Sequence, residues 1–169
     1  LLEQMKSPAF PIGVAGAGEG GLVAFYAAAI DTRIDATLVS GYFQEREGLW
    51  QEPIYRNVWR LLTEFGDAEL AGMIAPRRLV IEACRAVDVP GPPALRAGRR
   101  GSAAPGRIES SALTSVRAEF QRAAAIYKQL DRESEIVLVV SDQEGIGPAG
   151  SSRAVAKFTA GLGIESKFD

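Results

Sequence analysis

The residues of clearest chemical meaning lie in a glycine-rich turn, GAGEGG, which runs from Gly16 to Gly21. Apolar residues precede and follow this turn, at 11–16 and 20–30, and predict a strand, a tight turn and a helix. As G-x-G-x-x-G, through Gly16, Gly18 and Gly21, the turn fits a dinucleotide-binding loop in which the helix N-terminus faces a pyrophosphate. As G-x-S-x-G, it fits a nucleophile elbow in which Gly18 replaces the serine.

The segment after the first helix separates these two interpretations. A dinucleotide-binding unit places an acid at the end of its second strand, where the carboxylate binds the ribose hydroxyls. The second expected strand, at 34–41, instead runs into Tyr42, and Glu45 is the next acid. An elbow needs small residues two positions before and after its centre, and Gly16 and Gly20 meet that need. We therefore favour the elbow.

A nucleophile elbow works with a general base, and the sequence supplies no histidine among its 169 residues. Histidine is the usual base near neutral pH and a common metal ligand. A Ser-His-Asp triad within this chain and a histidine-based zinc site are therefore excluded, and we expect neither a cofactor nor a metal. Cys84 is the single cysteine. Because no imidazole can activate it, we interpret it as a buried structural residue rather than a nucleophile.

The composition is typical of a single globular domain, 1–169. Apolar residues make up 47% of the chain and charged residues 24%, and this length suffices for one core. The net charge of −2 gives no reason to expect nucleic acid as a partner. We expect a soluble chain without membrane contact, because no apolar run approaches the ~20 residues of a membrane helix and the first residues lack a signal-peptide pattern.

Four apolar segments alternate with helical patterns along the chain. Because these segments are almost continuously apolar, they predict parallel strands that are covered on both faces. The order of elements then predicts an α/β fold, a parallel sheet with helices on both faces. The helix at 20–30 is apolar on nearly every side, so we expect it to be buried. The other expected elements are strands at 11–16, 34–41, 77–84 and 135–142, helices at 54–65 and 113–130, a short helix capped by Asp67, and a last helix capped by Ser151 or Ser152.

The segment 85–107 interrupts this pattern. It is rich in Pro, Gly and Ala, and its charged residues are five arginines and one acid, Asp88. The arginines form either a basic clamp for an anionic ligand or part of a solvated excursion between a strand and the next helix, and we favour the excursion. They are Arg85, Arg96, Arg99, Arg100 and Arg107.

From residue 12 to about residue 84, the chain resembles the second half of an α/β-hydrolase, and more narrowly it is similar to bacterial acetyl xylan esterases and dienelactone hydrolase-like enzymes. Their elbow reads G-x-S-E-G-G, and GAGEGG matches every position except the serine. DTRIDATLVSGYF and MIAPRRLVIEAC resemble the strands that follow. That family places further strands before the elbow strand. The resemblance therefore implies an open edge on the strand from Pro11 to Gly16, with which a protein partner or a missing N-terminal half would pair.

The resemblance also assigns the family's catalytic positions. The nucleophile position falls on Gly18, which cannot attack a substrate. The oxyanion-type donor is the backbone N–H of Glu19, which survives a change of side chain. Asp88 is the nearest candidate for the catalytic acid, and the base would lie within 141–150, where Asp142 and other polar residues occur but no histidine.

These absences predict a pseudoenzyme, because a site without nucleophile and base retains only weak catalysis. The loss of two triad members points to natural decay rather than to a single engineered change. We therefore expect a catalytically degenerate α/β-hydrolase relative that acts as a binding or structural subunit. Two alternatives stay open: an esterase-type hydrolase completed by another chain, and a nucleotide-binding module that uses Gly16, Gly18 and Gly21.

Overall fold

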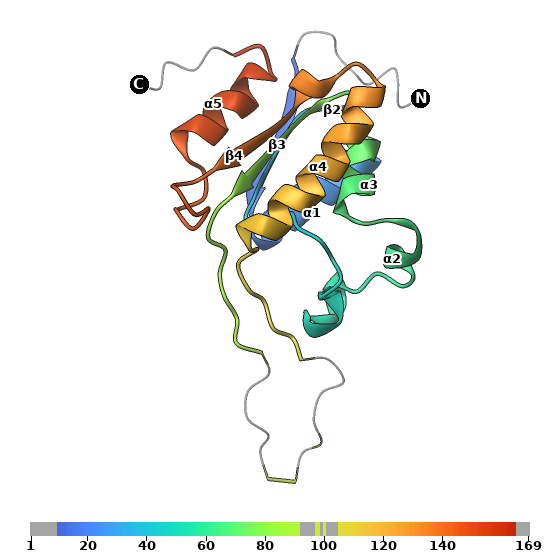
Figure 1. Cartoon of the computed structure of the whole chain (residues 1–169), viewed down its shortest axis with the longest axis vertical. Helices are drawn as coiled ribbons and strands as arrows, with labels where there is room; N and C mark the ends of the chain where they lie inside the picture. The colour runs from blue at the N-terminus through green and yellow to red at the C-terminus, as the bar shows by residue number, and fades with distance from the viewer. Residues whose placement is uncertain (1–9, 92–96, 99, 101–104, 165–169) are drawn as a thin grey trace.

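A computed structural model describes residues 10–91, 97–98, 100 and 105–164 of the chain. Within these residues four parallel strands form one sheet, and each strand lies beside the next one in the sequence (Figure 1). The sheet confirms the predicted α/β fold. The strands are β1 (Ile12–Ala17), β2 (Ile34–Ser40), β3 (Arg78–Ala83) and β4 (Ile136–Val140).

Helices cover both faces of this sheet, as predicted (Figure 1). Three helices lie on one face, the middle one packed against both others, and a single helix lies on the other face. On the first face are α1 (Glu19–Ile30), α3 (Asp67–Ile74) and α4 (Leu113–Gln129), and on the second is α5 (Ser152–Ala160).

The two faces arise from the alternation of side chains along each strand. Val39 and Ile81 belong to the large core beneath the three helices, together with Phe25 and Tyr127. Their neighbours point the other way, so that Val80 packs in the smaller cluster with Ala154 of α5, and neither of these two side chains is exposed. The strands therefore read as continuous apolar runs, because both sides of the sheet are covered.

The first helix is less completely buried than its composition predicts. Phe25 and Ala28 are fully buried, but Val23 is 63% exposed and Ile30 is 78% exposed. α1 packs against β1, β2 and α3, and its remaining face has no covering element among the described residues. The expectation of burial on every side was wrong because apolar composition does not show how many neighbours a helix has.

The helix expected at 54–65 is also absent from the structure. A 3-10 turn at Ile54–Arg56 is followed by a short helix, α2 (Leu61–Glu64), and Arg60 between them takes a φ angle of 61°, which interrupts a regular helix. Ile54 and Val58 stay exposed, at 71% and 51%. Their helical spacing was misleading because no surface of the described chain covers them.

The described parts of the excursion form two arms. An antiparallel bridge joins Val89 to Ile108, with N···O distances of 2.8 and 3.0 Å between their backbones. Arg107 donates to the side chain of Gln51 (2.8 Å) and forms an ion pair with Glu109 (3.2 Å). The predicted arginines Arg96 and Arg99 lie outside the described residues. Among the described helices, none is both long and apolar enough to cross a membrane.

Candidate functional site

The turn between β1 and α1 has the geometry of a nucleophile elbow. Its central residue, Gly18, has φ 53° and ψ −117°, a conformation that costs a non-glycine residue on the order of 1–3 kcal/mol. The backbone N–H of Gly18 donates to the carbonyl of Ser40 at 2.9 Å, which fixes the turn against the end of β2. A β-carbon on Gly16 would lie 2.1 Å from the carbonyl oxygen of Gly20, so Gly16 must be glycine.

On the helix side of the turn, the position that requires a glycine differs from the expected one. A β-carbon at Gly20 would meet nothing within 4 Å, so packing does not demand a glycine there. At Gly21 it would meet the carbonyl oxygens of Ser40 and Gly16 at 3.1 and 3.2 Å. The close approach of helix to strand therefore depends on Gly16 and Gly21, and the expectation for Gly20 was wrong.

A cavity of about 710 Å³ opens beside this turn. Its lining comes from the end of β1, the start of α1, the 3-10 turn Ile54–Arg56, both arms of the excursion and the loop between β4 and α5. It includes Gly18 and Glu19. As the first residue of α1, Glu19 carries a backbone N–H that has no partner within the helix. The full lining is Ala17, Gly18, Glu19, Tyr55, Arg56, Arg85, Ala86, Val87, Val89, Ile108, Pro148 and Ala149.

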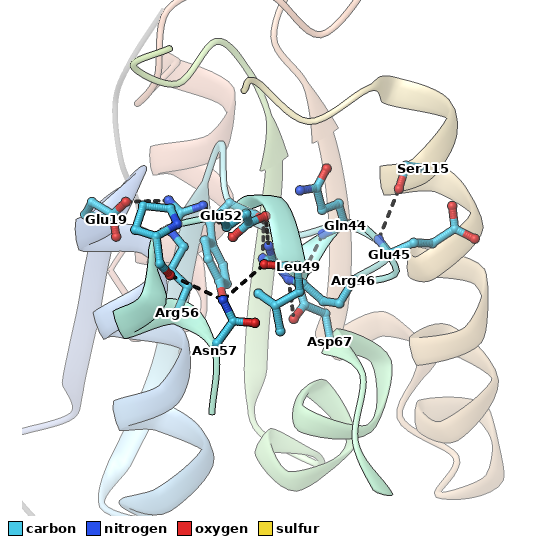
Figure 2. A network of polar contacts seen from close by, with 12 residues as sticks. Glu19, Gln44, Glu45, Arg46, Leu49, Glu52, Arg56, Asn57, Asp67 and Ser115 are labelled. Atoms are coloured by element: carbon cyan, nitrogen blue, oxygen red, sulfur yellow. Dashed lines mark hydrogen bonds and ion pairs between the residues drawn. The ribbon is translucent and has the colours of Figure 1, made fainter. Parts of the chain in front are cut away.

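Two residues of the 3-10 turn hold the side chain of Glu19 in place, and Figure 2 shows one of them, Arg56. Its carboxylate accepts hydrogen bonds from Arg56, at 2.5 Å, and from the hydroxyl of Tyr55, at 3.1 Å. Arg56 also donates to Glu52 at 2.9 Å. Partial desolvation, followed by the hydrogen bond to the Glu19 carboxylate, raises the pKa of Tyr55. Glu19, Tyr55 and Arg56 form the polar rim of the cavity, and Glu52 lies behind this rim.

A second arginine continues this chain of charges into the interior (Figure 2). Arg46 contacts Glu52 at 3.3 Å and Asp67 at 2.9 Å, and its guanidinium lies 3.8 Å from the centre of the Tyr42 ring. Burial raises the pKa of Asp67, and the adjacent Arg46 opposes this shift. Asp67 was expected to cap a helix; the structure instead places Gly66 at the N-cap and uses the Asp67 side chain to hold Arg46. The network therefore fixes the loop after β2 against α3.

The acid candidate Asp88 lies on the first arm of the excursion and outside the cavity lining. Its carboxylate accepts hydrogen bonds from the backbone N–H and hydroxyl of Ser110, at 2.6 and 3.0 Å. A different acid, Glu82, lies buried at the end of β3 and accepts hydrogen bonds from the hydroxyl of Ser40 (2.6 Å) and the N–H of Gly150 (2.7 Å). The sequence signal for a buried, hydrogen-bonded carboxylate at Glu82 is the place of this acid within an otherwise apolar strand.

The loop 141–150, which was expected to carry a base, is held by hydrogen bonds between its own residues. The carboxylate of Asp142 accepts hydrogen bonds from the backbone N–H groups of Glu144 and Gly145, at 2.8 and 2.9 Å. These acids are exposed and do not line the cavity, whereas Pro148 and Ala149 do. None of the residues that line the described cavity is a serine, threonine, cysteine or histidine. The lining therefore combines backbone donors, the guanidinium groups of Arg56 and Arg85, the Glu19 carboxylate and the Tyr55 hydroxyl with apolar walls.

Cys84 follows directly after β3. It is 2% exposed, does not line the cavity, and burial followed by the charge of Glu82 raises its pKa to about 12. A protonated, buried thiol is not a nucleophile, which agrees with its interpretation as a structural residue. Within the described residues, no cluster of three or more potential metal ligands occurs.

The four-stranded parallel sheet with helices on both faces defines an α/β fold, and this fold matches part of two known esterase structures. The structure of methylesterase BT1017 is similar with a TM-score of 0.60 and 20% identity, over 92% of this chain and 31% of that one. A carbohydrate esterase family 15 (CE15) glucuronoyl esterase from Caldicellulosiruptor kristjansonii is similar with a TM-score of 0.55 and 18% identity, over 99% of this chain and 50% of that one.

These similarities concern the fold, and they span half or less of the length of each esterase. No protein-family model matches the sequence, and no curated protein matches it in a sequence search.

Proposed function

We propose that this chain is a catalytically degenerate relative of esterase-type α/β-hydrolases that acts as a binding or structural subunit. One observation carries the proposal. Gly18 occupies the central position of the turn, where a nucleophile would stand, and has backbone angles that would be strained for any other residue. The turn therefore retains the shape of a catalytic elbow without its reactive group.

The chemistry of the remaining groups supports binding rather than turnover. Glycine has no side chain to form an acyl intermediate, and the sequence contains no histidine to activate water. Backbone donors such as the N–H of Glu19 stabilise an oxyanion only after a nucleophile has attacked. The same donors and an apolar cavity still bind a ligand that contains a carbonyl or an anionic oxygen.

An ester panel tests the proposal. The purified chain should hydrolyse acetyl, methyl and aryl esters no faster than buffer does, and Gly18→Ser should not restore turnover because the base is missing as well. Turnover by the wild-type chain that survives repurification would contradict the proposal. Turnover that appears only when a second purified chain is added would favour the alternative of an esterase completed by that chain.

The edge of β1 supports a role as one part of a larger assembly. Among the described residues β1 pairs only with β2, so its other edge is unpaired, and Ala15 and Ala17 are exposed. Ile12 is 47% exposed, and Phe10, just before the strand, is 81% exposed. An unpaired, uncharged edge accepts a further strand. We infer that a parallel strand from a protein partner, or from another part of a longer protein, pairs here.

The isolated chain offers a test of this edge, because an uncovered strand also pairs with copies of itself. Light scattering should show self-association that rises with concentration, and Ala15→Lys should reduce it by placing a charge on β1. Thr114→Lys, which adds the same charge on the exposed surface of α4, should leave it unchanged. Equal self-association of both variants would contradict the assignment of the edge.

A further inference from the structure

We propose that the cavity beside Gly18 binds a ligand with a single carboxylate and an apolar body, and that Arg85 binds the carboxylate. This inference rests on the proposed function, since a site that does not turn over its ligand can serve to hold it. It concerns the ligand class of the same site, and it follows from the charges and walls of the cavity.

Three charged side chains line the cavity, and two of them neutralise each other. The side chain of Arg56 is 5% exposed, and its two terminal nitrogens donate to Glu19 and Glu52. Glu19 in turn accepts a hydrogen bond from Tyr55. Because Glu19 and Glu52 balance the charge of Arg56, these groups add no net positive charge that a ligand would have to neutralise.

Arg85 is the third charged residue of the lining, and its charge is not balanced in the same way. In the described part of the chain, no hydrogen bond or ion pair engages its guanidinium. Its backbone N–H donates to the carbonyl of Gly147 at 2.9 Å, which fixes the residue beside the loop between β4 and α5. The nearby Arg107, by contrast, is paired with Gln51 and Glu109. The cavity therefore carries one positive charge that a ligand can neutralise.

The remaining walls are apolar. Val87, Val89, Ile108 and Pro148 contribute to them, and the bridge between Val89 and Ile108 holds the two arms together. A volume of about 710 Å³ lies within the range of small-molecule sites, which combine apolar walls with a few polar groups. These walls match a hydrocarbon or aromatic body rather than a sugar or a nucleotide.

The charge pattern favours a carboxylate over a phosphate monoester. A guanidinium binds a planar carboxylate through two parallel hydrogen bonds. A phosphate dianion would bring a second negative charge close to the carboxylate of Glu19, which also lines the cavity. A singly charged ligand avoids that repulsion while it neutralises Arg85.

Isothermal titration with octanoate tests the proposal. We expect saturable binding to the wild-type chain and at least about tenfold weaker binding to Arg85→Gln, which keeps the size of the side chain but removes its charge. Arg117→Gln is the matched control. Arg117 is exposed on α4, lies outside the cavity lining and forms no ion pair within the described residues, so this variant should bind as the wild type does. Octanol lacks the carboxylate. Its affinity for the wild-type chain should therefore not exceed the affinity of octanoate for Arg85→Gln.

A second variant separates a loss of binding from a change in the fold. Val87 is 78% exposed and lines the cavity, so Val87→Glu should fold normally and weaken octanoate binding through repulsion. Absence of saturable octanoate binding, equal affinity of the wild type and Arg85→Gln, or equal affinity for octanol would each overturn the proposal. Hydrolysis of esters would instead overturn the proposed function, so the two failures are distinguishable.

Discussion

The buried carboxylate of Glu82 accepts hydrogen bonds from both the backbone N–H and the hydroxyl of Ser151, at 2.9 and 2.5 Å. Ser151 caps α5, and Glu82 lies one residue before the end of β3, so this contact joins the sheet to the helix on its far face. Ser40 and Gly150 donate to the same carboxylate. Because the loop before α5 forms part of the cavity wall, Glu82 fixes the shape of the site as well as the fold.

Glu82→Gln should lower the free energy of unfolding by about 2–3 kcal/mol, because an amide NH₂ group would replace an acceptor that faces several donors. Urea unfolding followed by circular dichroism measures the change. Glu144→Gln is the control, because Glu144 is exposed on the loop after β4. The urea midpoint of this variant should equal that of the wild type. Equal midpoints for the two variants would show that the buried contact contributes no stability.

Three alanine variants separate backbone strain from steric clash at the elbow. Gly18→Ala should cost about 1–3 kcal/mol through its positive φ angle alone, because the added β-carbon meets nothing within 4 Å. Gly16→Ala should cost about 3 kcal/mol, because its β-carbon would clash with the backbone of Gly20. Gly20→Ala should gain about 0.5 kcal/mol, because it favours the helix without a clash. Thermal unfolding gives the order, and a loss at Gly20 equal to that at Gly16 would contradict the geometry.

Cys84 should be unreactive in the native protein. Its pKa, raised to about 12 by burial, keeps the thiol protonated, so alkylation by iodoacetamide at pH 8 should be at least about a thousandfold slower than in the urea-unfolded chain. Mass spectrometry of quenched samples measures both rates. Comparable rates in the two states would mean that the thiol is accessible and ionised, and would reopen its role as a nucleophile.

Much of the fold could be predicted from local patterns. Both the continuous apolar strands and the long helix α4 are local signals, and the structure places α4 at Leu113–Gln129, within a residue of the expected 113–130. The tight turn between β1 and α1 was predictable for the same reason, because its glycines are close together in the sequence. Apolar spacing failed at 54–65 because a periodic pattern forms a helix only where a surface is present to cover it.

The polar contacts of the site could not be predicted in this way. Glu82 meets Ser151 across 69 positions of sequence, and Arg56 meets Glu19 across 37. Such pairs depend on the sheet order and on the path of the loops, which no local pattern specifies. The same limit applies to Asp88: its place after β3 suggested a catalytic acid, whereas the fold directs its carboxylate to Ser110.

The pair formed by Asp31 and Arg33 at the end of α1 should make stability depend on pH in the acid range. Arg33 donates to the Asp31 carboxylate through its backbone N–H and its guanidinium, and these bonds lower the pKa of Asp31 to about 2 from 3.8. A carboxylate with a lowered pKa stabilises the folded state above its unfolded pKa and loses that contribution as the pH falls toward the folded one. Wild-type stability should therefore fall between about pH 4 and pH 2, and Asp31→Asn should fall less steeply there. Urea midpoints measured at intervals of half a pH unit give both slopes. If Asp31→Asn and the wild type lose stability in parallel, the contact between Asp31 and Arg33 is not maintained in solution.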